Sequence, residues 1–216
     1  MTTIAVLGGT GKEGSGLAMR WAMKGYSVIV GSRDAERARS RAAEMSAEIG
    51  SGHLVGMGND EAATKADVVV LSVPYTAHKA TLESVREQVQ GKVLIDLTVP
   101  LQPPKVRTVH LPEGKSAALE AQVLLGEGVK VVAACQNVSA EHLGDPNYVV
   151  DCDVLVCGND AEAKKTVIDL VAATGMRGVD AGSLANAVAV ESLTPVLLYI
   201  NKAYSAKGAG IRITGI

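Results

Sequence analysis

The chain has 216 residues, a hydrophobic fraction of 47% and a formal net charge of -2. This length can form one generous domain, or one domain with a helical appendage, and its core must be aliphatic because the chain has no Phe. A balanced charge without basic, aromatic-interleaved runs argues against a nucleic-acid partner.

Hydropathy and cysteine usage predict a cytoplasmic protein without a membrane partner. We expect no apolar segment of membrane-spanning length, and an apolar strand at the N-terminus in place of a signal peptide. The three cysteines, Cys135, Cys152 and Cys157, have no C-x-x-C spacing. They are expected to be buried free thiols in a reducing cytosol, and the sequence predicts no metal site.

Residues 4–30 carry a dinucleotide-binding pattern. An apolar run at 4–7 predicts a buried strand, a helical stretch covers about 15–24, and a second apolar run follows at 28–30. Between the first strand and the helix lies a G-x-G-x-x-G loop made of Gly9, Thr10, Gly11, Lys12, Glu13 and Gly14. The glycines allow a tight turn and close approach of a pyrophosphate, which the N–H groups of the helix N-terminus would bind. A glycine turn without a ligand is the alternative.

The end of the second strand indicates which dinucleotide is preferred. An acidic residue there is typical of NAD sites, whereas Arg and hydroxyl groups suit the 2′-phosphate of NADP. This chain has Ser32 and Arg33 at that point, and Arg37 lies one helical turn further on. The competing acidic residue, Asp34, is interpreted as the N-terminal residue of the next helix. Arg39 and Arg41 are assigned to a solvated helix face.

The remainder alternates strand and helix patterns. Strands are predicted at 53–56, 67–73, 93–97, 129–133, 152–157 and 178–180, and helices at 59–66, 77–88, 116–125, 161–173 and 184–206. Apolar runs separated by helices indicate an α/β fold, a Rossmann-type doubly wound parallel sheet, here with a small C-terminal helical part. We expect a dinucleotide-binding domain at 1–150 and, at 151–216, a smaller part that completes the sheet edge, the acceptor site and a dimer interface.

Two Val-Pro pairs follow strands whose carboxyl ends should border the cofactor. In doubly wound sheets the ligand lies across these ends. Val73-Pro74 and Val99-Pro100 would therefore lie beside the nicotinamide, although simple strand termination explains the prolines equally well. The longest irregular segment follows at 100–114, and loops of that length are often functional.

Familiar reductase motifs do not account for the chemistry, and no catalytic side chain is predicted. Tyr75 and Lys79 match Y-x-x-x-K, but they follow a strand directly and come too early in the chain for the short-chain dehydrogenase pair. Residues 184–200 of the last predicted helix carry Glu191 and lack the Lys of hydroxyacid dehydrogenases. The four histidines, His53, His78, His110 and His142, are expected at surface or loop positions. A hydride donor without an acid or base partner suggests that another redox cofactor is the acceptor.

These segments together resemble the NADPH-dependent reductases of the deazaflavin coenzyme F420 along nearly the whole chain. The matching pieces are VLGGTGKEG at 6–14, VGSR at 30–33, SVP at 72–74, VCGND at 156–160 and DAGSLANAVAVESLTP at 180–195. The resemblance implies a homodimer that binds NADP(H) and uses F420 as co-substrate. It places the phosphate loop at Thr10, Gly11, Lys12 and Glu13, the 2′-phosphate clamp at Ser32, Arg33 and Arg37, and nicotinamide contacts at Val73, Val99 and Ala140.

One departure from the family bears on the acceptor. Relatives carry a His-Thr-Ile-Pro-Ala type stretch beside the deazaflavin, where this chain has Gln136, Asn137, Val138, Ser139 and Ala140. Gln donates a hydrogen bond as His does, but it does not titrate near neutral pH. Another flavin-like or planar acceptor, or a non-enzymatic NADP-sensing role, therefore stays open as an alternative to F420.

Overall fold

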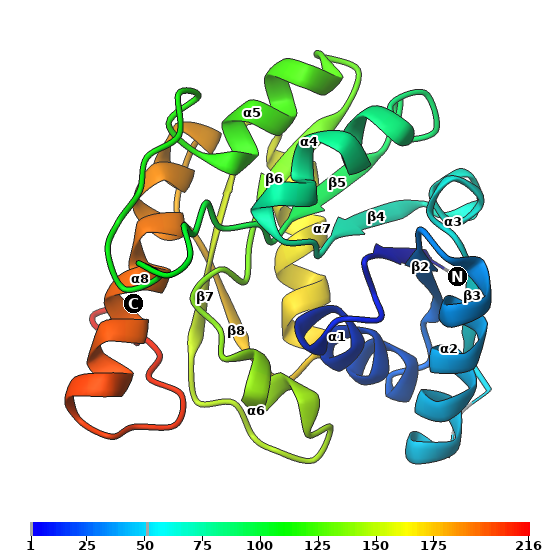
Figure 1. The fold of residues 1–216 in the computed structure, drawn as a ribbon, viewed down its shortest axis with the longest axis horizontal. Coiled ribbons are helices and arrows are strands. Elements are labelled where there is room, and N and C mark those ends of the chain that lie inside the picture. The colour runs from blue at the N-terminus through cyan, green and yellow to red at the C-terminus, as the bar shows by residue number, and fades with distance from the viewer. Residues whose placement is uncertain (1, 51) are drawn as a thin grey trace.

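The computed structural model of the protein describes residues 2–50 and 52–216. One eight-stranded sheet runs through it in the order β3-β2-β1-β4-β5-β6-β7-β8, which is the arrangement of a doubly wound fold (Figure 1). The strands are β1 (Thr3–Leu7), β2 (Ser27–Ser32), β3 (Leu54–Gly58), β4 (Val68–Leu71), β5 (Val93–Asp96), β6 (Lys130–Ala133), β7 (Asp153–Gly158) and β8 (Arg177–Asp180). The predicted α/β class and Rossmann-type topology are confirmed.

The sheet is mostly parallel, and one strand pair corrects the expectation of a fully parallel sheet. β7 pairs antiparallel with β6, with Val132 opposite Gly158 and Ala133 opposite Cys157, while β8 is parallel to β7. An apolar run carries no information about strand direction, so the sequence pattern could not show this reversal. As a result β7 and β8 extend the sheet beyond β6 with their carboxyl ends on the opposite side.

Helices cover both faces of the sheet. They are α1 (Lys12–Met23), α2 (Ala35–Ile49), α3 (Asn59–Lys65), α4 (Tyr75–Ser84), α5 (Ala117–Leu125), α6 (Ala140–Gly144), α7 (Ala161–Ala173) and α8 (Ala187–Ala203), with a 3-10 turn, η1 (Leu184–Asn186), before α8. Side chains of α1, α2, α6 and α7 form one aliphatic core, and those of α3, α4, α5, η1 and α8 form the other (Figure 1). All three cysteines are free and buried, as expected.

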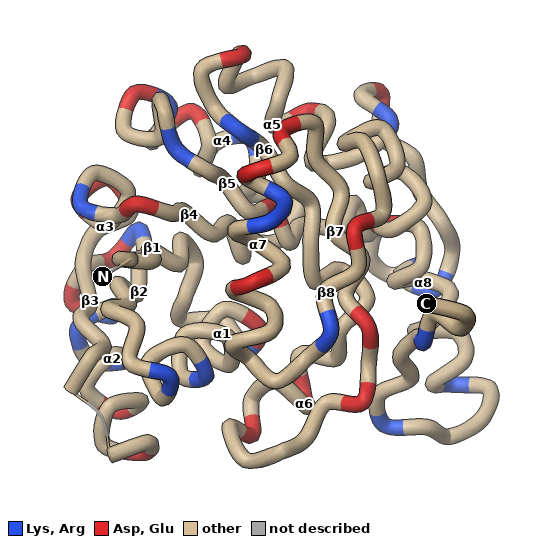
Figure 2. The backbone as a smooth tube through the Cα atoms, turned by 180° about the vertical axis from the view of Figure 1, so that it is seen from behind, with Lys and Arg blue, Asp and Glu red and all other residues tan. Residues whose placement is uncertain are grey.

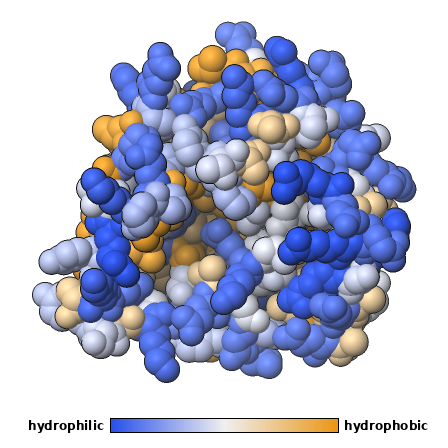
Figure 3. Space-filling model, viewed as in Figure 1, coloured by the Kyte–Doolittle hydropathy of each residue, from blue (hydrophilic) through white to orange (hydrophobic). Residues whose placement is uncertain are grey.

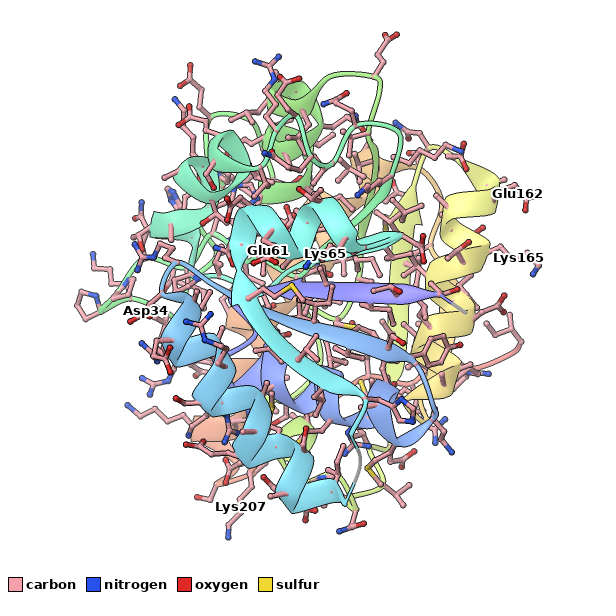
Figure 4. All side chains as sticks on the ribbon, turned by 90° about the vertical axis from the view of Figure 1, so that its right-hand side faces the viewer. Asp34, Glu61, Lys65, Glu162, Lys165 and Lys207 are labelled. Carbon is pink, nitrogen blue, oxygen red and sulfur yellow. The ribbon has the colours of Figure 1, made fainter. Side chains whose placement is uncertain are left out.

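Two helix starts near the strand ends shape the site. α1 begins at Lys12 and not near Ser15, so the glycine loop leads directly into the helix. α2 begins after Asp34, whose carboxylate accepts hydrogen bonds from the backbone N–H groups of Glu36 (3.0 Å) and Arg37 (3.2 Å). Asp34 is thus the N-cap that the sequence predicts, and Figure 4 shows it at the start of this helix. The segment 97–116 contains turns but no helix or strand.

The C-terminal helical segment corrects one expectation from hydropathy. Residues Leu184–Ala203 form 20 residues of helix with a mean hydropathy of 1.3, long and apolar enough to cross a membrane by length and composition alone. A core helix of a protein without membrane contact meets the same criterion, although only 33% of the apolar window is buried here. Here the segment packs against α5 and contains Glu191. The sequence places this acid on the helix, and the structure shows that it is buried.

Candidate functional site

Two cavities meet where the glycine loop passes the carboxyl ends of β1, β2 and β4. The basic cavity, of about 290 Å³, is lined by Gly8, Thr10, Gly11, Ser32, Arg33, Arg37, Asn59, Ser72, Val73, Pro74, Ala77 and Thr81. The apolar cavity, of about 520 Å³, shares Gly11, Ser72, Val73 and Pro74 with it and extends under α8. Figure 3 shows an apolar hollow on this face of the molecule. A ligand that fills both cavities would pass across the start of α1.

Three glycines of the loop, Gly8, Gly9 and Gly14, have no space for a side chain. Gly8 has φ +75°, and a Cβ there would lie 2.3 Å from the carbonyl oxygen of Ser72. A Cβ on Gly9 would lie 2.7 Å from the carbonyl oxygen of Val6, and one on Gly14 would lie 3.0 Å from the Cα of Gly9. Gly9 and Gly14 therefore line neither cavity but hold loop and helix together. Gly11 caps α1 without a side chain, so the first N–H groups remain free for an anion, which fits a pyrophosphate.

The basic cavity holds two arginines with no carboxylate partner. Among the described residues Arg33 and Arg37 form no ion pair, and both are exposed. Arg39 and Arg41, on the same helix, bind Glu36 and Glu44 at 2.7 and 3.0 Å on the solvated face. The nearby hydroxyl of Ser32 is buried and accepts a hydrogen bond from the N–H of Asp34 (3.2 Å). Two unpaired guanidinium groups beside a hydroxyl suit a dianionic phosphate.

Asn59 also lines the basic cavity, and the sequence analysis missed it. Its side chain is 7% exposed, and its Oδ1 is buried without a hydrogen-bond partner among the described residues. Asn59 is the first residue after β3, which neighbours β2. A polar residue directly after a predicted strand was the available signal, because the ends of parallel strands meet at one edge of a sheet.

The apolar cavity brings together segments that are far apart in the chain. Val73, Val99 and Ala140, predicted to lie beside the nicotinamide, all line it, as do Lys12 and Glu13. Glu13 is partly buried, and burial raises the pKa of its carboxyl to about 8. The opposite wall comes from the C-terminal part, which sequence reasoning did not resolve into residues: Thr194, Leu197, Leu198, Asn201, Lys207 and Ala209.

Gln136 and Asn137 lie in this cavity wall but are held by the protein. Gln136 Nε2 donates to the carbonyl oxygen of Asp96 (2.7 Å), and Asn137 Nδ2 donates to the carbonyl oxygen of Asp153 (2.7 Å). The amide oxygens of both residues, Gln136 Oε1 and Asn137 Oδ1, are buried without partners among the described residues. Buried acceptors without a partner are unusual in proteins, and both residues line the apolar cavity.

His78 corrects the expectation that the histidines lie at the surface. Its side chain is 2% exposed, and Nε2 lies 2.7 Å from Oδ2 of the fully buried Asp96. Burial disfavours the imidazolium, but the hydrogen bond and charge of Asp96, with the charges of Glu120 and Glu191, raise the pKa of His78. The sequence could not show this contact, since it depends on a residue in a strand that packs under α4.

Tyr75 and Lys79 do not form a catalytic pair. The hydroxyl of Tyr75 donates to Glu120 Oε2 (2.8 Å), and burial together with Glu120 raises the pKa of Tyr75 to about 12. Lys79 Nζ lies 4.0 Å from Glu83 on the solvated side of α4. The hydroxyl is therefore engaged by Glu120, and Tyr75 lines neither of the two cavities. The described residues contain no cluster of three potential metal ligands.

The fold and these cavities define a dinucleotide-binding oxidoreductase of the Rossmann class. The family described as "NADP oxidoreductase coenzyme F420-dependent" matches residues 3–100. The chain is 42% identical to the F420-dependent NADP reductase of Methanocaldococcus jannaschii, over 99% of this chain and 98% of that protein. It is 43% identical to the enzyme of the same name from Methanothermobacter marburgensis, over 99% and 98%. The chain belongs to the family of F420-dependent NADP reductases.

A solved structure agrees with this assignment. A protein from Arthrobacter sp. FB24, provisionally described as an F420-dependent NADP reductase, superimposes with a TM-score of 0.84 at 27% identity, covering 100% of both chains. The match includes the C-terminal wall of the apolar cavity as well as the glycine loop. The resemblance seen in the sequence motifs is thus confirmed along the whole chain.

Proposed function

We propose that this protein transfers a hydride between NADP(H) and the deazaflavin coenzyme F420. The observation that carries the proposal is the junction of the two cavities at Val73 and Pro74, with unpaired arginines in one and an apolar chamber in the other. A dinucleotide laid across the start of α1 would place its phosphates at the basic end. Its nicotinamide would then reach the apolar cavity, where a planar ring can stack.

Twelve residues would hold NADP(H). The glycine loop would bind the pyrophosphate through its backbone, Ser32, Arg33 and Arg37 would bind the 2′-phosphate, and three small apolar residues would contact the nicotinamide. They are Gly9, Thr10, Gly11, Lys12, Glu13, Gly14, Ser32, Arg33, Arg37, Val73, Val99 and Ala140. Of these, Gly9 and Gly14 line neither cavity and would act by shaping the loop. When bound, NADPH supplies the hydride. The protein supplies the orientation of two rings and the exclusion of water, with no obligatory side-chain acid.

The acceptor has a second candidate. Gln136 stands where the resemblance places a His in relatives, so a flavin or another planar acceptor is the alternative, with a non-enzymatic NADP-sensing role behind it. The apolar lining of the apolar cavity suits any flat heterocycle. F420 is favoured because the chain matches enzymes with that name, at 42% and 43% identity, over 99% of its length.

We further infer a cytoplasmic homodimer that binds neither nucleic acid nor a membrane. The net charge of -2 supports the absence of a nucleic-acid surface, and Figure 2 shows acidic and basic residues interspersed over the visible face. Glu191, buried inside α8, is a poor residue for a lipid-facing helix. Residues 151–216 would form the smaller part that completes the acceptor site and the dimer interface, beside a binding domain at 1–150.

An anaerobic acceptor panel tests the function. NADPH oxidation is followed with F420, FMN, FAD, a quinone and a cyclic imine at equal concentrations. We expect kcat/KM for F420 to exceed that for each other acceptor by at least about tenfold, a difference of about 1.4 kcal/mol in the transition state. A flavin that matches or exceeds F420 would support the second candidate. No turnover with any acceptor, despite tight NADPH binding, would support the sensing role.

A further inference from the structure

A single buried arginine on α1, Arg20, joins this helix to α6 and to the loop that follows α6. Its side chain is 7% exposed, and its three guanidinium nitrogens all donate to main-chain carbonyl oxygens. The acceptors are the carbonyl oxygens of His142 (3.2 Å), Leu143 (3.4 Å), Asp145 (2.7 Å), Tyr148 (2.8 Å) and Thr174 (3.3 Å). Four of these five belong to α6 or to the residues directly after it. Arg20 therefore fastens the segment 142–148 to α1.

The two helices also meet one turn nearer to the glycine loop. A Cβ on Gly16 would lie 2.5 Å from the carbonyl oxygen of Leu143, so the backbones of α1 and α6 are in contact there. Glu13, Gly16 and Arg20 are spaced three and four residues apart and therefore share one face of α1. Glu13 lines the apolar cavity. The face of α1 that begins at the predicted phosphate loop is thus the face that α6 contacts.

The short helix α6 carries this contact to the cavity wall. Ser139 and Ala140, its N-cap and first residue, both line the apolar cavity. The turn is closed by the N–H of Leu143, which donates to the carbonyl oxygen of Ser139 (3.0 Å). The N–H of His142 donates to the Ser139 hydroxyl (3.5 Å). Because Arg20 holds the carbonyl groups of the same two donor residues, it fixes Ala140 through hydrogen bonds within one turn.

Arginine is the side chain that this arrangement requires. The last carbonyl groups of a helix have no N–H partner within it, and two of the acceptors, His142 and Leu143, lie at the end of α6. A planar guanidinium presents five N–H groups in a fixed fork, whereas an ammonium presents three from a single atom. Arg20→Lys should therefore keep the charge but lose most of the hydrogen bonds.

We propose that Arg20 is a positioning residue that fixes Ala140 relative to the start of α1, and so fixes the nicotinamide relative to the bound phosphates. The inference rests on the proposed function, which lays NADP(H) from the glycine loop to the wall at Ala140. Arg20 lines neither cavity and acts only through α6. Both ends of the cofactor would then be bound by one rigid unit. Hydride transfer depends on such a unit, because a displacement of about 1 Å can lower a rate about 100-fold.

Single-turnover hydride transfer from NADPH to F420 tests the role. Arg20→Met, which keeps an unbranched side chain without donors, should lower the rate about 10- to 100-fold, and Arg20→Lys should lower it less. Gly16→Ala, which inserts a Cβ against the Leu143 carbonyl, should have a similar effect. The double variant should lose less than the product of the two, because both changes loosen the same contact. The Kd for adenosine 2′,5′-bisphosphate, which lacks the nicotinamide half, should stay within about twofold.

Trp21→Phe is the matched control. Trp21 follows Arg20 on α1 and is buried as well, but its indole N–H donates to the carbonyl oxygen of Leu170 on α7 (2.8 Å). The variant removes a buried hydrogen bond of α1 that does not involve α6. It should lower the free energy of unfolding and leave hydride transfer within about twofold of the wild type. If Trp21→Phe slows hydride transfer as much as Arg20→Met does, or if the effects of Arg20→Met and Gly16→Ala multiply, the positioning role is refuted.

A second readout needs no acceptor. The fluorescence lifetime of the dihydronicotinamide in bound NADPH reports how firmly the ring is held. It should shorten in Arg20→Met and Gly16→Ala and keep the wild-type value in Trp21→Phe. Equal lifetimes in all four proteins would overturn the proposal even if F420 is reduced. A lifetime that depends on Arg20, without reduction of F420, would support the positioning role and count against the proposed function alone. Arg20→Lys and Gly16→Ala carry both measurements if Arg20→Met does not fold.

Discussion

Arg33, just before α2, and Arg37, within it, differ from Arg39 and Arg41 of the same helix because they have no carboxylate partner among the described residues. Glu36 and Glu44 neutralise Arg39 and Arg41, so the only uncompensated guanidinium groups among the described residues of this helix and its approach face the basic cavity. An unpaired charge beside a cavity gains most from an anionic ligand, since no existing ion pair has to be broken.

We therefore expect NADP(H) to bind at least about tenfold more tightly than NAD(H), from one or two charge-assisted hydrogen bonds. Arg33→Ala should remove most of this preference, while Arg39→Ala, which alters only a solvated ion pair, should leave it intact. Fluorescence titration of both dinucleotides measures the two affinities. Equal affinities in the wild type would contradict the assignment of the 2′-phosphate clamp.

Polar side chains in the apolar cavity are expected to contribute modestly to the chemical step. Alanine at Gln136, Asn137 or Ser139, or at Tyr75 outside the cavity, should lower single-turnover hydride transfer by about 10- to 100-fold or less, below the loss expected for an essential acid. Tyr75 should have the smallest effect, because its hydroxyl binds Glu120. A loss beyond about 10⁴-fold at one position, with NADPH binding intact, would identify a catalytic residue that the structure does not suggest.

His78 should make stability depend on pH. Its folded-state pKa is raised, so the folded protein binds this proton more tightly than the unfolded chain does. The contribution is complete below the unfolded value of about 6.5 and is lost as pH rises through the folded pKa. His78→Gln should thus lower the free energy of unfolding by about 1 to 3 kcal/mol at pH 6 and by less at pH 9. Urea denaturation at both pH values measures this, and an equal loss would argue against a charged His78.

At the scale of elements, apolar runs were sufficient to predict the strands. Residues 4–7, 28–30 and 67–73 fall on β1, β2 and β4, and even the weak pattern at 53–56 falls on β3. Strand direction and the first residues of helices were harder to predict from the sequence. The reversal of β7 leaves no trace in its composition, and α1 starts three residues earlier than its apolar pattern because Lys12, Glu13 and Gly14 are polar or small.

The site divides in the same way. The glycine loop and Ser32-Arg33 are contiguous in the chain, so a local motif predicts them. The His78–Asp96 pair and the C-terminal wall at Thr194 depend on contacts between α4, β5 and α8, which only the folded chain brings together. Contacts of this kind have no spacing rule, and the histidine was consequently assigned to the surface.

The junction of α8 and α5 depends on Glu191. Its carboxylate accepts from the N–H groups of Ala117 (2.7 Å) and Ala118 (3.0 Å) at the start of α5, although burial raises its pKa to about 8. Glu191→Ala should destabilise the protein by about 1 to 3 kcal/mol, since two buried donors lose their acceptor. Glu191→Gln retains one acceptor oxygen and should cost less.

The neighbouring Ser192→Ala is the control for that variant. Ser192 donates only to the carbonyl oxygen of Val188 within α8 (2.6 Å) and does not reach α5. It should change the free energy of unfolding by less than about 0.5 kcal/mol. A similar loss for Glu191→Ala and Ser192→Ala would mean that the contact between the helices contributes little.

At the scale of the whole molecule, α8 presents apolar residues at the protein surface. This helix lies in the part expected to form a dimer interface, and three apolar residues of the helical segment, Leu184, Val190 and Leu197, are buried within the chain. Val188, Leu193, Val196 and Ile200 remain wholly or partly accessible, and Tyr199 is 61% exposed beside them. The apolar residues that stay accessible lie along one helix. They are consistent with an interface to a second copy of the chain.

Light scattering at micromolar concentration is expected to give twice the 22.3 kDa mass of one chain. Val196→Glu, which places a charge on the exposed side of α8 (45% exposed for Val196), should shift the equilibrium toward the monomer. Tyr204→Glu, near the end of the helix, is the comparison for added charge alone. A stable monomer of the wild type would exclude the dimer.

The residues that line the two cavities come from different parts of the chain. The basic cavity is complete by Thr81, whereas the apolar cavity needs residues as late as Ala209. During synthesis the binding surface for the adenosine end can therefore form while the acceptor chamber still lacks a wall. The same division makes the C-terminal third exchangeable in evolution: a relative that replaces α8 and the segment behind it can acquire a new electron acceptor without rebuilding its specificity for the dinucleotide.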